Sequence, residues 1–414
     1  MRRVAIALCG FACLAALCAG SPAAQPRPQA PATPRFERGD SVVVREVEIF
    51  DRIIYFHTRV NGAGAFTFVL DTGAGAMSAI DQSVADSLGL HSTLMRRGGG
   101  AGEDVVDFNS VDSIAVSVNG LSFEPRRVMG IPLHRMDPHW GKRKDGLVGG
   151  DLLSTLVTCI DYEGRTVTFH DERSYEYRGP GERIPVHVFG GALFVDAQVL
   201  SYGSDRAIDA LLMLDTGLRL TVFNTPFSRA QELAAQSPST ATGVTGFGIG
   251  GVSRGIVGRV KGIRIGSVLF ENPVVDFSTD ERGALSDTGF SGIIGADLLS
   301  RCRLIIDYAR SEIFLEKNRS FAEPFEFDMS GIRFVMEGKS FDVLKIFSVF
   351  ENSPAAEAGI RPGDVVTSID GQVTASFTRE SLRDYMQREG ARVRLDIKRG
   401  AETKSMTLQL RRLV

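Results

Sequence analysis

The chain has 414 residues, of which 43% are hydrophobic and 23% are charged, and its formal net charge is −3. These values are typical of a soluble globular protein with room for two or three domains. The small net charge and the lack of a basic block exclude nucleic acid as an expected partner.

The first 23 residues predict a signal peptide. Met1-Arg2-Arg3 is a basic start, residues 4–19 are apolar, and Ser21-Pro22-Ala23 offers the small residues that signal peptidase reads. The alternative is an uncleaved anchor, but about 16 apolar residues are short of the roughly 20 that span a bilayer. We therefore expect a periplasmic or secreted protein with no stable membrane span after cleavage, and a Pro/Ala-rich linker over residues 24–40.

Five cysteines are present, and three of them lie in the predicted signal peptide. The mature chain keeps Cys159 and Cys302, so at most one disulfide can form, and the sequence leaves their pairing open. The fold must therefore be held by packing of a hydrophobic core, for which the chain is long enough.

Folded sequence is expected from residue 41 onward. Short runs of β-branched and aromatic residues predict strands over 41–49 and 53–60, and Asn61-Gly62 is typical of a hairpin turn. The apolar run 66–70 then ends in Asp71-Thr72-Gly73. This pattern indicates a buried strand that delivers a carboxylate to a tight turn.

The same stretch returns in the second half of the chain. The apolar run 212–214 ends in Asp215-Thr216-Gly217, 144 residues after the first motif. A glycine-rich segment follows each motif, and an apolar pair, a glycine and an Asp-Leu-Leu-Ser sequence follow in both halves, with Asp151 and Asp297 146 residues apart. Landmarks in one order at nearly one offset indicate a duplication. We therefore expect two lobes, over residues 41–178 and 179–322.

On its two Asp-Thr-Gly motifs the chain resembles the retropepsin-like aspartic proteases. The resemblance implies a fold dominated by β-structure, in which two lobes form a pseudo-dimer and contribute Asp71 and Asp215 as the catalytic residues. Two carboxylates forced within about 3 Å cannot both ionise, so the pair shares one proton and can activate a water. The alternative is two solvated turn aspartates, which the matching repeat disfavours. Because both half-sites lie on one chain, a monomer is expected.

The resemblance also assigns supporting roles around the two acids. It implies that Thr72 and Thr216 interlock beneath the acids, and that Gly73 and Gly217 let the backbone come close to them. Leu218 departs from the small residue that the family prefers after the second glycine.

Two further landmarks carry structural expectations. The resemblance implies that Gly149 and Gly295 make room for strands that pass beside the Asp loops. We expect Asp151 and Asp297 to be N-caps of the short helices that follow. A third Asp-Thr-Gly, at Asp287, does not follow an apolar run and is expected in a loop.

The glycine clusters predict two flaps that fold over a bound peptide, with Gly99 and Gly100 in the first and Gly248 and Gly250 in the second. The alternative is a pair of floppy surface loops. A phosphate-binding loop does not fit, since no Gly-Lys-Ser/Thr sequence follows either cluster.

Other chemistries are not indicated. The six histidines show no His-Glu-x-x-His motif and no close ligand set, and His134 and His139 are expected in loops near Trp140. Ser291 lacks the second glycine of a nucleophile elbow. We expect no metal and no cofactor.

Residues 352–371 closely resemble part of a PDZ domain, which would span 325–414 and have its second helix over 378–389. The resemblance implies a small barrel with two helices that captures a C-terminal or extended peptide. Its expected peptide-binding residues are Gly331, Ile332, Arg333, Phe334 and Leu382. Arg333 stands where the family has a second glycine, and its charge suits a carboxylate. The alternative is a module that only buttresses the second lobe.

Taken together, the sequence predicts an exported aspartic endopeptidase with a PDZ domain for recognition of a polypeptide substrate or partner. One alternative is a catalytically silent protease-like scaffold that acts as a PDZ-mediated binding protein. Another is a regulator that cleaves a single partner. The sequence does not identify the substrate or the cleavage preference.

Overall fold

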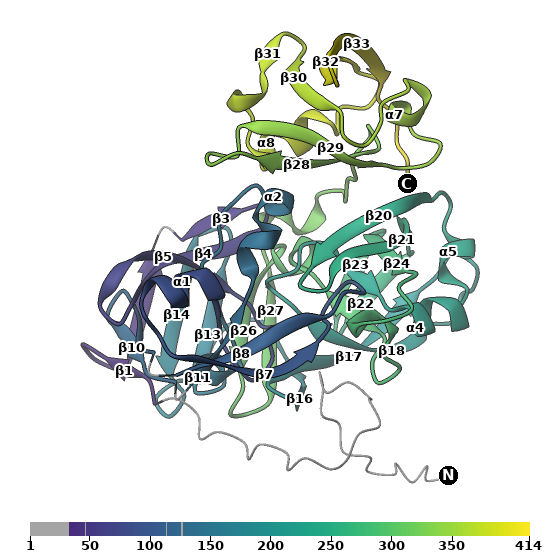
Figure 1. Ribbon diagram of the computed structural model, residues 1–414. Coiled ribbons are helices and arrows are strands. Elements are labelled where there is room, and N and C mark those ends of the chain that lie inside the picture. The colour runs from purple at the N-terminus through teal and green to yellow at the C-terminus, as the bar shows by residue number, and fades with distance from the viewer. Residues whose placement is uncertain (1–32, 46, 113, 126) are drawn as a thin grey trace, which may run out of the picture.

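The computed structural model describes residues 33–45, 47–112, 114–125 and 127–414. The predicted signal peptide lies outside these residues. Figure 1 shows a wide two-lobed body, purple to green, with a smaller yellow-green domain seated on one side of it. The fold is mostly β-structure, as predicted. We call the halves of the body lobe 1 and lobe 2, and the smaller domain the C-terminal domain.

Lobe 1 is built on a sheet that has eleven strands among the described residues. These strands are β1 (Arg35–Phe36), β3 (Glu48–Phe50), β4 (Ile53–Val60), β5 (Ala63–Leu70), β6 (Ala79–Asp81), β7 (Ser92–Gly98), β8 (Val106–Asp112), β9 (Val116–Val118), β10 (Leu121–Phe123), β11 (Arg127–Ile131) and β12 (Gly146–Val148). Its helices are α1 (Gln82–Ser87), η1 (Leu133–Met136), α2 (Asp137–Trp140) and α3 (Gly150–Leu153).

Lobe 2 is built on a second sheet, with ten strands in the same described part of the chain. They are β16 (His187–Phe189), β17 (Ala192–Leu200), β18 (Ile208–Leu214), β19 (Val222–Phe223), β20 (Ala241–Gly248), β21 (Gly251–Arg259), β22 (Gly262–Ile265), β23 (Val268–Glu271), β24 (Val274–Ser278) and β25 (Gly292–Ile294). Its helices are α4 (Thr225–Ala230), α5 (Leu233–Gln236), η2 (Ala284–Ser286) and α6 (Ala296–Leu299).

The two large sheets have the same strand order. Lobe 1 runs β10-β9-β4-β5-β12-β6-β11-β8-β7, and lobe 2 runs β23-β22-β17-β18-β25-β19-β24-β21-β20. In each, the strand that precedes Asp-Thr-Gly (β5 or β18) pairs in parallel with the strand that precedes the Gly-x-Asp-Leu-Leu segment (β12 or β25). The repeat in the sequence is therefore a repeat of topology.

A third sheet joins the lobes. Its order is β15-β27-β26-β13-β14-β2, and its strands are β2 (Ser41–Arg45), β13 (Leu156–Asp161), β14 (Thr166–Asp171), β15 (Glu182–Pro185), β26 (Cys302–Asp307) and β27 (Glu312–Lys317). At its centre β13 of lobe 1 pairs with β26 of lobe 2. One continuous hydrophobic cluster contains buried residues of both lobes. Cys159 and Cys302 lie in this sheet as buried free thiols.

Two expectations about the N-terminal region were wrong. The predicted linker 24–40 contains β1, which pairs with β10, and Phe36 packs against the main core, so ordered chain starts before residue 41. The predicted strand 41–49 is two strands, because β2 joins the third sheet through β14 while β3 joins the lobe 1 sheet through β4. The strand 53–60 and the turn at Asn61-Gly62 are confirmed.

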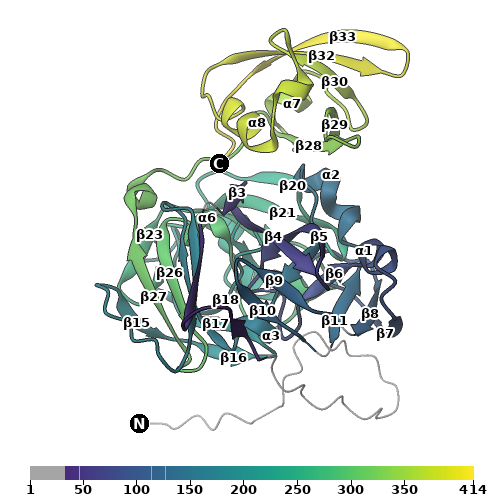
Figure 2. The same ribbon diagram turned by 90° about the vertical axis from the view of Figure 1, so that its left-hand side faces the viewer.

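The C-terminal domain follows η3 (Arg319–Ala322) and has its own hydrophobic core. Its elements are β28 (Ile332–Glu337), β29 (Val343–Val349), α7 (Pro354–Glu357), β30 (Val365–Ile369), β31 (Gln372–Val373), η4 (Thr374–Ser376), α8 (Arg379–Tyr385), β32 (Arg392–Arg399) and β33 (Glu402–Gln409). Figure 2 shows β28, β29 and α8 on the side that faces the body.

The second helix of this domain is shorter than predicted. The helix was expected over 378–389, but Thr378 is its N-cap in a capping box with Ser381, and Met386 is its C-cap. The carbonyl of Met386 accepts the N–H of Met329, which ties the end of this helix to the entrance of the domain. In the described part of the chain, no helix has the length and apolar character needed to cross a membrane.

Truncating Ile305 should destabilise the whole two-lobed body. Ile305 is fully buried at the centre of the third sheet, opposite Cys159. We expect Ile305→Ala to lower the free energy of unfolding by about 2–5 kcal/mol, because it removes buried methyl groups and leaves a cavity. Urea unfolding measures this. Val43→Ala is the matched control, since Val43 lies in β2 of the same sheet but is 41% exposed, and an equal loss from both variants would contradict the interpretation.

Candidate active site

The two motif aspartates lie at equivalent places in the lobes. Asp71 follows β5, and its N–H bonds to the carbonyl of Val148 in β12 at 3.1 Å. Asp215 follows β18, and its N–H bonds to the carbonyl of Ile294 in β25 at 3.0 Å. Each acid is thus held at the end of one buried strand by the parallel strand beside it.

The glycines of the motifs show how closely the two acids approach each other. A Cβ on Gly217 would lie 2.6 Å from Cγ of Asp71, and a Cβ on Gly73 would overlap the carboxyl of Asp215. Real Cβ atoms do not come this close, so each glycine is required by the acid of the opposite lobe. The expected role of both glycines follows from this close contact.

Backbone donors orient each carboxyl. The N–H of Gly73 bonds to Oδ1 of Asp71 at 2.9 Å, and the N–H groups of Gly217 and Leu218 bond to Oδ1 of Asp215 at 2.7 and 3.0 Å. Each carboxyl also packs against the glycine of the opposite motif. Leu218 thus supplies a backbone donor, a role that does not depend on its departure from the family's small residue.

Burial raises the pKa of both acids. For Asp215 the charge of Asp71 adds to the effect of burial, and the pKa lies well above the ordinary range. For Asp71 burial is partly opposed by the charge of Lys144 and by the N–H of Gly73. Because the second charge on such a pair is strongly disfavoured, the pair retains one proton where an ordinary aspartate would be ionised.

Thr72 and Thr216 interlock beneath the acids. The hydroxyl of Thr72 donates to the carbonyl of Leu214 at 2.8 Å, and that of Thr216 donates to the carbonyl of Leu70 at 2.7 Å. The hydroxyl of Thr72 also accepts the N–H of Thr216 at 3.1 Å, and the hydroxyl of Thr216 accepts the N–H of Thr72 at 3.2 Å. Both residues are fully buried or nearly so. Four reciprocal bonds therefore join the two motif strands across the lobe boundary.

The glycines after β12 and β25 make room for neighbouring backbone. A Cβ on Gly149 would lie 2.8 Å from the carbonyl oxygen of Met77, and one on Gly295 would overlap the carbonyl of Arg219. Arg219 follows the second Asp-Thr-Gly by two residues, so this landmark strand does lie against the Asp loop of lobe 2.

The expected capping role of Asp151 and Asp297 was wrong. The N-caps of α3 and α6 are Gly149 and Gly295, and the two acids lie within the first helical turn. The glycines take the cap position because the close approach of neighbouring backbone leaves no room for a side chain there. Asp151 instead accepts a 2.5 Å hydrogen bond from the hydroxyl of Ser78, and Asp297 pairs with two arginines described below.

The two glycine-rich hairpins meet tip to tip. We call β7–β8 flap 1 and β20–β21 flap 2. The N–H of Gly250 bonds to the carbonyl of Ala101 at 2.8 Å, and the N–H of Asp104 bonds to the carbonyl of Gly250 at 2.7 Å. The candidates lie at this contact, since Gly100 packs on Ile249 and Gly248 packs on Ala101, while Gly99 lies beside Gly283. The flaps are closed.

Flap 2 reaches the region of the first acid. Phe247 and Ile249 of flap 2 pack against the same hydrophobic cluster as Ala74, which directly follows the first Asp-Thr-Gly. Flap 2 is therefore packed against lobe 1 and is not a free surface loop.

The predicted peptide-binding loop of the C-terminal domain is engaged within the chain. The N–H of Gly331 bonds to Asp328 at 2.7 Å, and that of Ile332 bonds to the hydroxyl of Ser330 at 3.1 Å. The guanidinium of Arg333 donates to backbone carbonyls of flap 2. Ile332, Phe334 and Leu382 are buried and contribute to the core of the domain.

The remaining positions named in the sequence analysis lie partly in loops and partly in short helices. Asp287 lies in a loop, as expected, and accepts the N–H of Gly289 at 2.7 Å. His134 lies in η1 and His139 in α2, so the expectation that they lie in loops was wrong, because Pro138 at the start of α2 favours a helical turn. No group of three or more metal-ligating side chains occurs in the described ranges.

Sequence reasoning missed two charged residues near the acids. Lys144 is 2% exposed, its ammonium lies 2.8 Å from the centroid of the Trp140 ring, and burial lowers its pKa well below the ordinary value. Arg219 pairs with Asp51 and Asp297. Neither residue stands in a motif, although the position of Arg219 so soon after Gly217 was a usable signal.

Comparison with known families agrees with this description. A model described as an aspartyl protease matches residues 56–152, and a model described as a PDZ domain matches residues 346–399. The chain therefore contains an aspartyl protease domain and a C-terminal PDZ domain. The first match includes Asp71 and ends before the second motif.

Individual proteins match over different shares of the chain. Proteins named probable CtpA-like serine protease, from Staphylococcus aureus (strains COL and N315) and Staphylococcus haemolyticus (strain JCSC1435), are 34% identical over 95 residues. The match covers 23% of this chain, which spans about a fifth (19%) of the length of these curated relatives. The crystal structure of an aspartic proteinase from Irpex lacteus aligns over 68% of this chain and 99% of its own, with 13% identity and a TM-score of 0.42.

Removing either interlocking hydroxyl should destabilise the protein. Thr72→Ala leaves the carbonyl of Leu214 and the N–H of Thr216 without their partner, and Thr216→Ala does the same to Leu70 and Thr72. We expect each change to lower the free energy of unfolding by about 1–3 kcal/mol, which is typical for buried polar groups left unpaired. Urea unfolding is the measurement. The matched Thr→Ser variants keep the hydroxyl, and a loss from them as large as from the Ala variants would contradict the role of the hydrogen bonds.

Proposed function

We propose that this chain is an aspartic endopeptidase, in which Asp71 and Asp215 activate one water for hydrolysis of a peptide bond. The observation that carries the proposal is the pair of buried carboxyls, one from each lobe, each packed against the glycine of the opposite motif above two interlocked threonines. Solvated turn aspartates do not have raised pKa values or a glycine of the opposite lobe packed against them.

The chemistry follows from one shared proton. The ionised carboxyl accepts a proton from the water, whose oxygen attacks the scissile carbonyl carbon. The protonated carboxyl donates to the carbonyl oxygen and stabilises the developing negative charge. The tetrahedral species then collapses: the C–N bond breaks, and a proton passes to the leaving amine. Because the titration belongs to the pair, neither role is assigned to one residue.

The closed flaps supply the rest of the site. A polypeptide substrate enters when the tips separate at Ala101 and Gly250, and the hairpins then cover it and keep bulk water from the acids. A glycine-rich tip suits this role because it can change backbone conformation at low cost.

The aspartic type is preferred over the serine type named for the curated relatives. A match of 95 residues can contain the C-terminal domain but not both lobes, so it does not carry the catalytic centre proposed here. The support for an aspartic mechanism lies instead in the two motifs and their contacts.

Further parts of the proposal rest on the sequence. The basic and apolar N-terminus supports export to the periplasm or exterior, and the substrates would then be exported or envelope proteins. Both half-sites lie on one chain, which supports a monomeric enzyme. The PDZ domain supports capture of a peptide of the substrate or of a partner.

Both acids should be needed equally. We expect Asp71→Asn and Asp215→Asn each to remove nearly all peptide hydrolysis, because either change removes the shared ionisation that activates water. The measurement is digestion of a mixture of peptides, with near-native circular dichroism as evidence of folding. Asp287→Asn, in the third Asp-Thr-Gly, is the control and should keep full activity. Retention of more than about a tenth of wild-type activity by Asp215→Asn would exclude the shared-water mechanism and favour a silent binding scaffold or another nucleophile.

The pH profile should be bell-shaped with an acidic to mildly acidic optimum. The active pair carries one proton: protonation of both acids removes the base at low pH, and loss of the last proton removes the acid at higher pH. Because burial raises the pKa of both acids, the high-pH limb should lie above the ordinary range of aspartate. The measurement is kcat/KM against pH. A rate that keeps rising into the alkaline range would indicate a different nucleophile.

A further inference from the structure

The edge of the C-terminal sheet where a PDZ domain adds a peptide strand is covered by lobe 1. β28 pairs with β29 on one side and is the edge strand of its sheet, and α8 lies beside it. We call the space between β28 and α8 the groove. In Figures 1 and 2 both β28 and α8 lie on the side of the C-terminal domain that faces the body, with α2 next to β28. An exposed strand edge between a sheet and a helix is what PDZ domains offer to a peptide.

Side chains and backbone of the chain itself occupy the groove. The guanidinium of Arg379 in α8 donates to the carbonyl of Phe334 in β28 at 3.3 Å, a group that an added strand would use. Gly141 of lobe 1 closes the space from outside, since a Cβ there would lie 2.8 Å from Sδ of Met336 and 3.3 Å from Cβ of Arg379. An incoming peptide strand and lobe 1 therefore cannot occupy this edge together.

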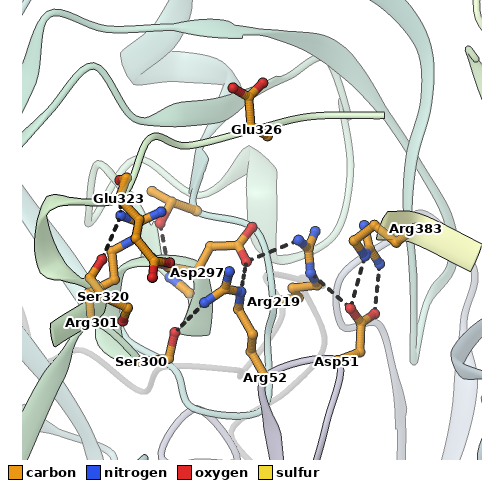
Figure 3. Close-up of polar contacts among 12 residues, drawn as sticks. Asp51, Arg52, Arg219, Asp297, Ser300, Arg301, Ser320, Glu323, Glu326 and Arg383 are labelled. Atoms are coloured by element: carbon orange, nitrogen blue, oxygen red, sulfur yellow. Dashed lines mark hydrogen bonds and ion pairs between the residues drawn. The ribbon is translucent and has the colours of Figure 1, made fainter. Parts of the chain in front are cut away.

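A carboxylate of lobe 1 pairs with the arginines of α8, the helix that borders the groove. Both oxygens of Asp51 accept hydrogen bonds from Arg383 of α8, at 3.0 and 2.7 Å (Figure 3). Arg379 of the same helix lies 3.4 Å from Asp51. The side chain of Asp51 is only 13% exposed. Burial would raise its pKa, but the charges of Arg383, Arg219 and Arg379 outweigh burial and lower it below the ordinary range. This bidentate arginine–carboxylate contact is the recognition expected for a ligand carboxylate.

The same carboxylate connects the groove to the Asp loop of lobe 2. Nε of Arg219 lies 3.0 Å from Asp51, and its Nη2 lies 3.1 Å from Asp297, which also pairs with Arg52 at 3.1 Å (Figure 3). Nε of Arg219 and Oδ1 of Asp297 make these contacts as ion pairs without hydrogen-bond alignment. The attraction between Arg219 and Asp51 is therefore electrostatic, and neutralising Asp51 weakens it.

The docked domain also holds flap 2. Arg333 donates to the carbonyls of Val244 and Thr245 in β20, at 3.2 and 2.8 Å. The ring of His139 in α2 stacks on Phe247 of flap 2, with centroids 3.7 Å apart, and meets Phe347 of β29 edge-on. One flap is thus bonded to the C-terminal domain on one side and to lobe 1 on the other.

We propose that lobe 1 occupies the PDZ groove while the C-terminal domain is docked on the body. A polypeptide with a free C-terminal carboxylate then binds only when the C-terminal domain leaves the body, and this departure frees flap 2. This inference rests on the peptide capture proposed above. When the binding-competent form is only a fraction of the molecules, the apparent Kd rises by the inverse of that fraction. Weakening the docked contact from the lobe 1 side should therefore tighten peptide binding without any change to the groove.

The test is a comparison of peptide affinity in full-length variants. The probe is a fluorescent decapeptide with an apolar C-terminal residue and a free carboxylate, beside its amidated twin. Asp51→Asn keeps the shape of the side chain and removes its charge, and His139→Ala weakens the contact at a second place. Asp205→Ala, at a fully exposed acid of lobe 2, is the control. We expect both lobe 1 variants to bind the free-carboxylate probe at least about tenfold more tightly than wild type, and the control to match wild type.

A second readout follows flap 2 directly. Amide hydrogen exchange in residues 241–248 should increase when the free-carboxylate probe binds wild type, because the bonds from Arg333 are lost, and the amidated twin at the same concentration should have no such effect. Equal affinity of wild type, Asp51→Asn and His139→Ala for the probe would overturn this inference alone. Absence of binding in every form would overturn the proposed peptide capture and this inference with it.

Discussion

The reciprocal hydrogen bonds of Thr72 and Thr216 are the constraint on which the rest of the body depends. Each hydroxyl donates to the residue just before the opposite acid and accepts from the opposite threonine. The two acid-bearing loops are thereby held in one register across the lobe boundary. The glycines next to them can approach the acids only in this register, which is why a motif of three residues determines the geometry of the whole site.

Bringing two acids together in a buried place is costly, and the surrounding fold offsets that cost. Burial raises the pKa of both carboxyls, so the folded state is destabilised when both carboxyls are charged. Packing between the lobes offsets this cost. In the third sheet β13 of lobe 1 pairs with β26 of lobe 2, and a single core extends through both lobes. The lobes are therefore parts of one packed body, and the site is assembled as that body folds.

A second electrostatic centre relates this body to the C-terminal domain. Asp51 lies at the turn between β3 and β4 and receives arginines from α8 and from the Asp loop of lobe 2. Three parts of the chain thus meet at one carboxylate. Such buried pairs add little net stability when compared with apolar packing of similar volume. Loss of the carboxylate would leave three guanidinium groups without their shared partner.

The sequence alone determined the features that recur or are local. The duplicated Asp-Thr-Gly motifs identified Asp71, Asp215, Thr72 and Thr216, and Asn61-Gly62 identified a hairpin, because repeats and turns leave a signature within a few residues. Tertiary structure decided which segments meet: that Gly149 and not Asp151 caps a helix, that Phe36 joins a sheet, and that Asp51 faces Arg383. These contacts join residues distant along the chain, and single charged residues carry no periodicity from which a partner can be read.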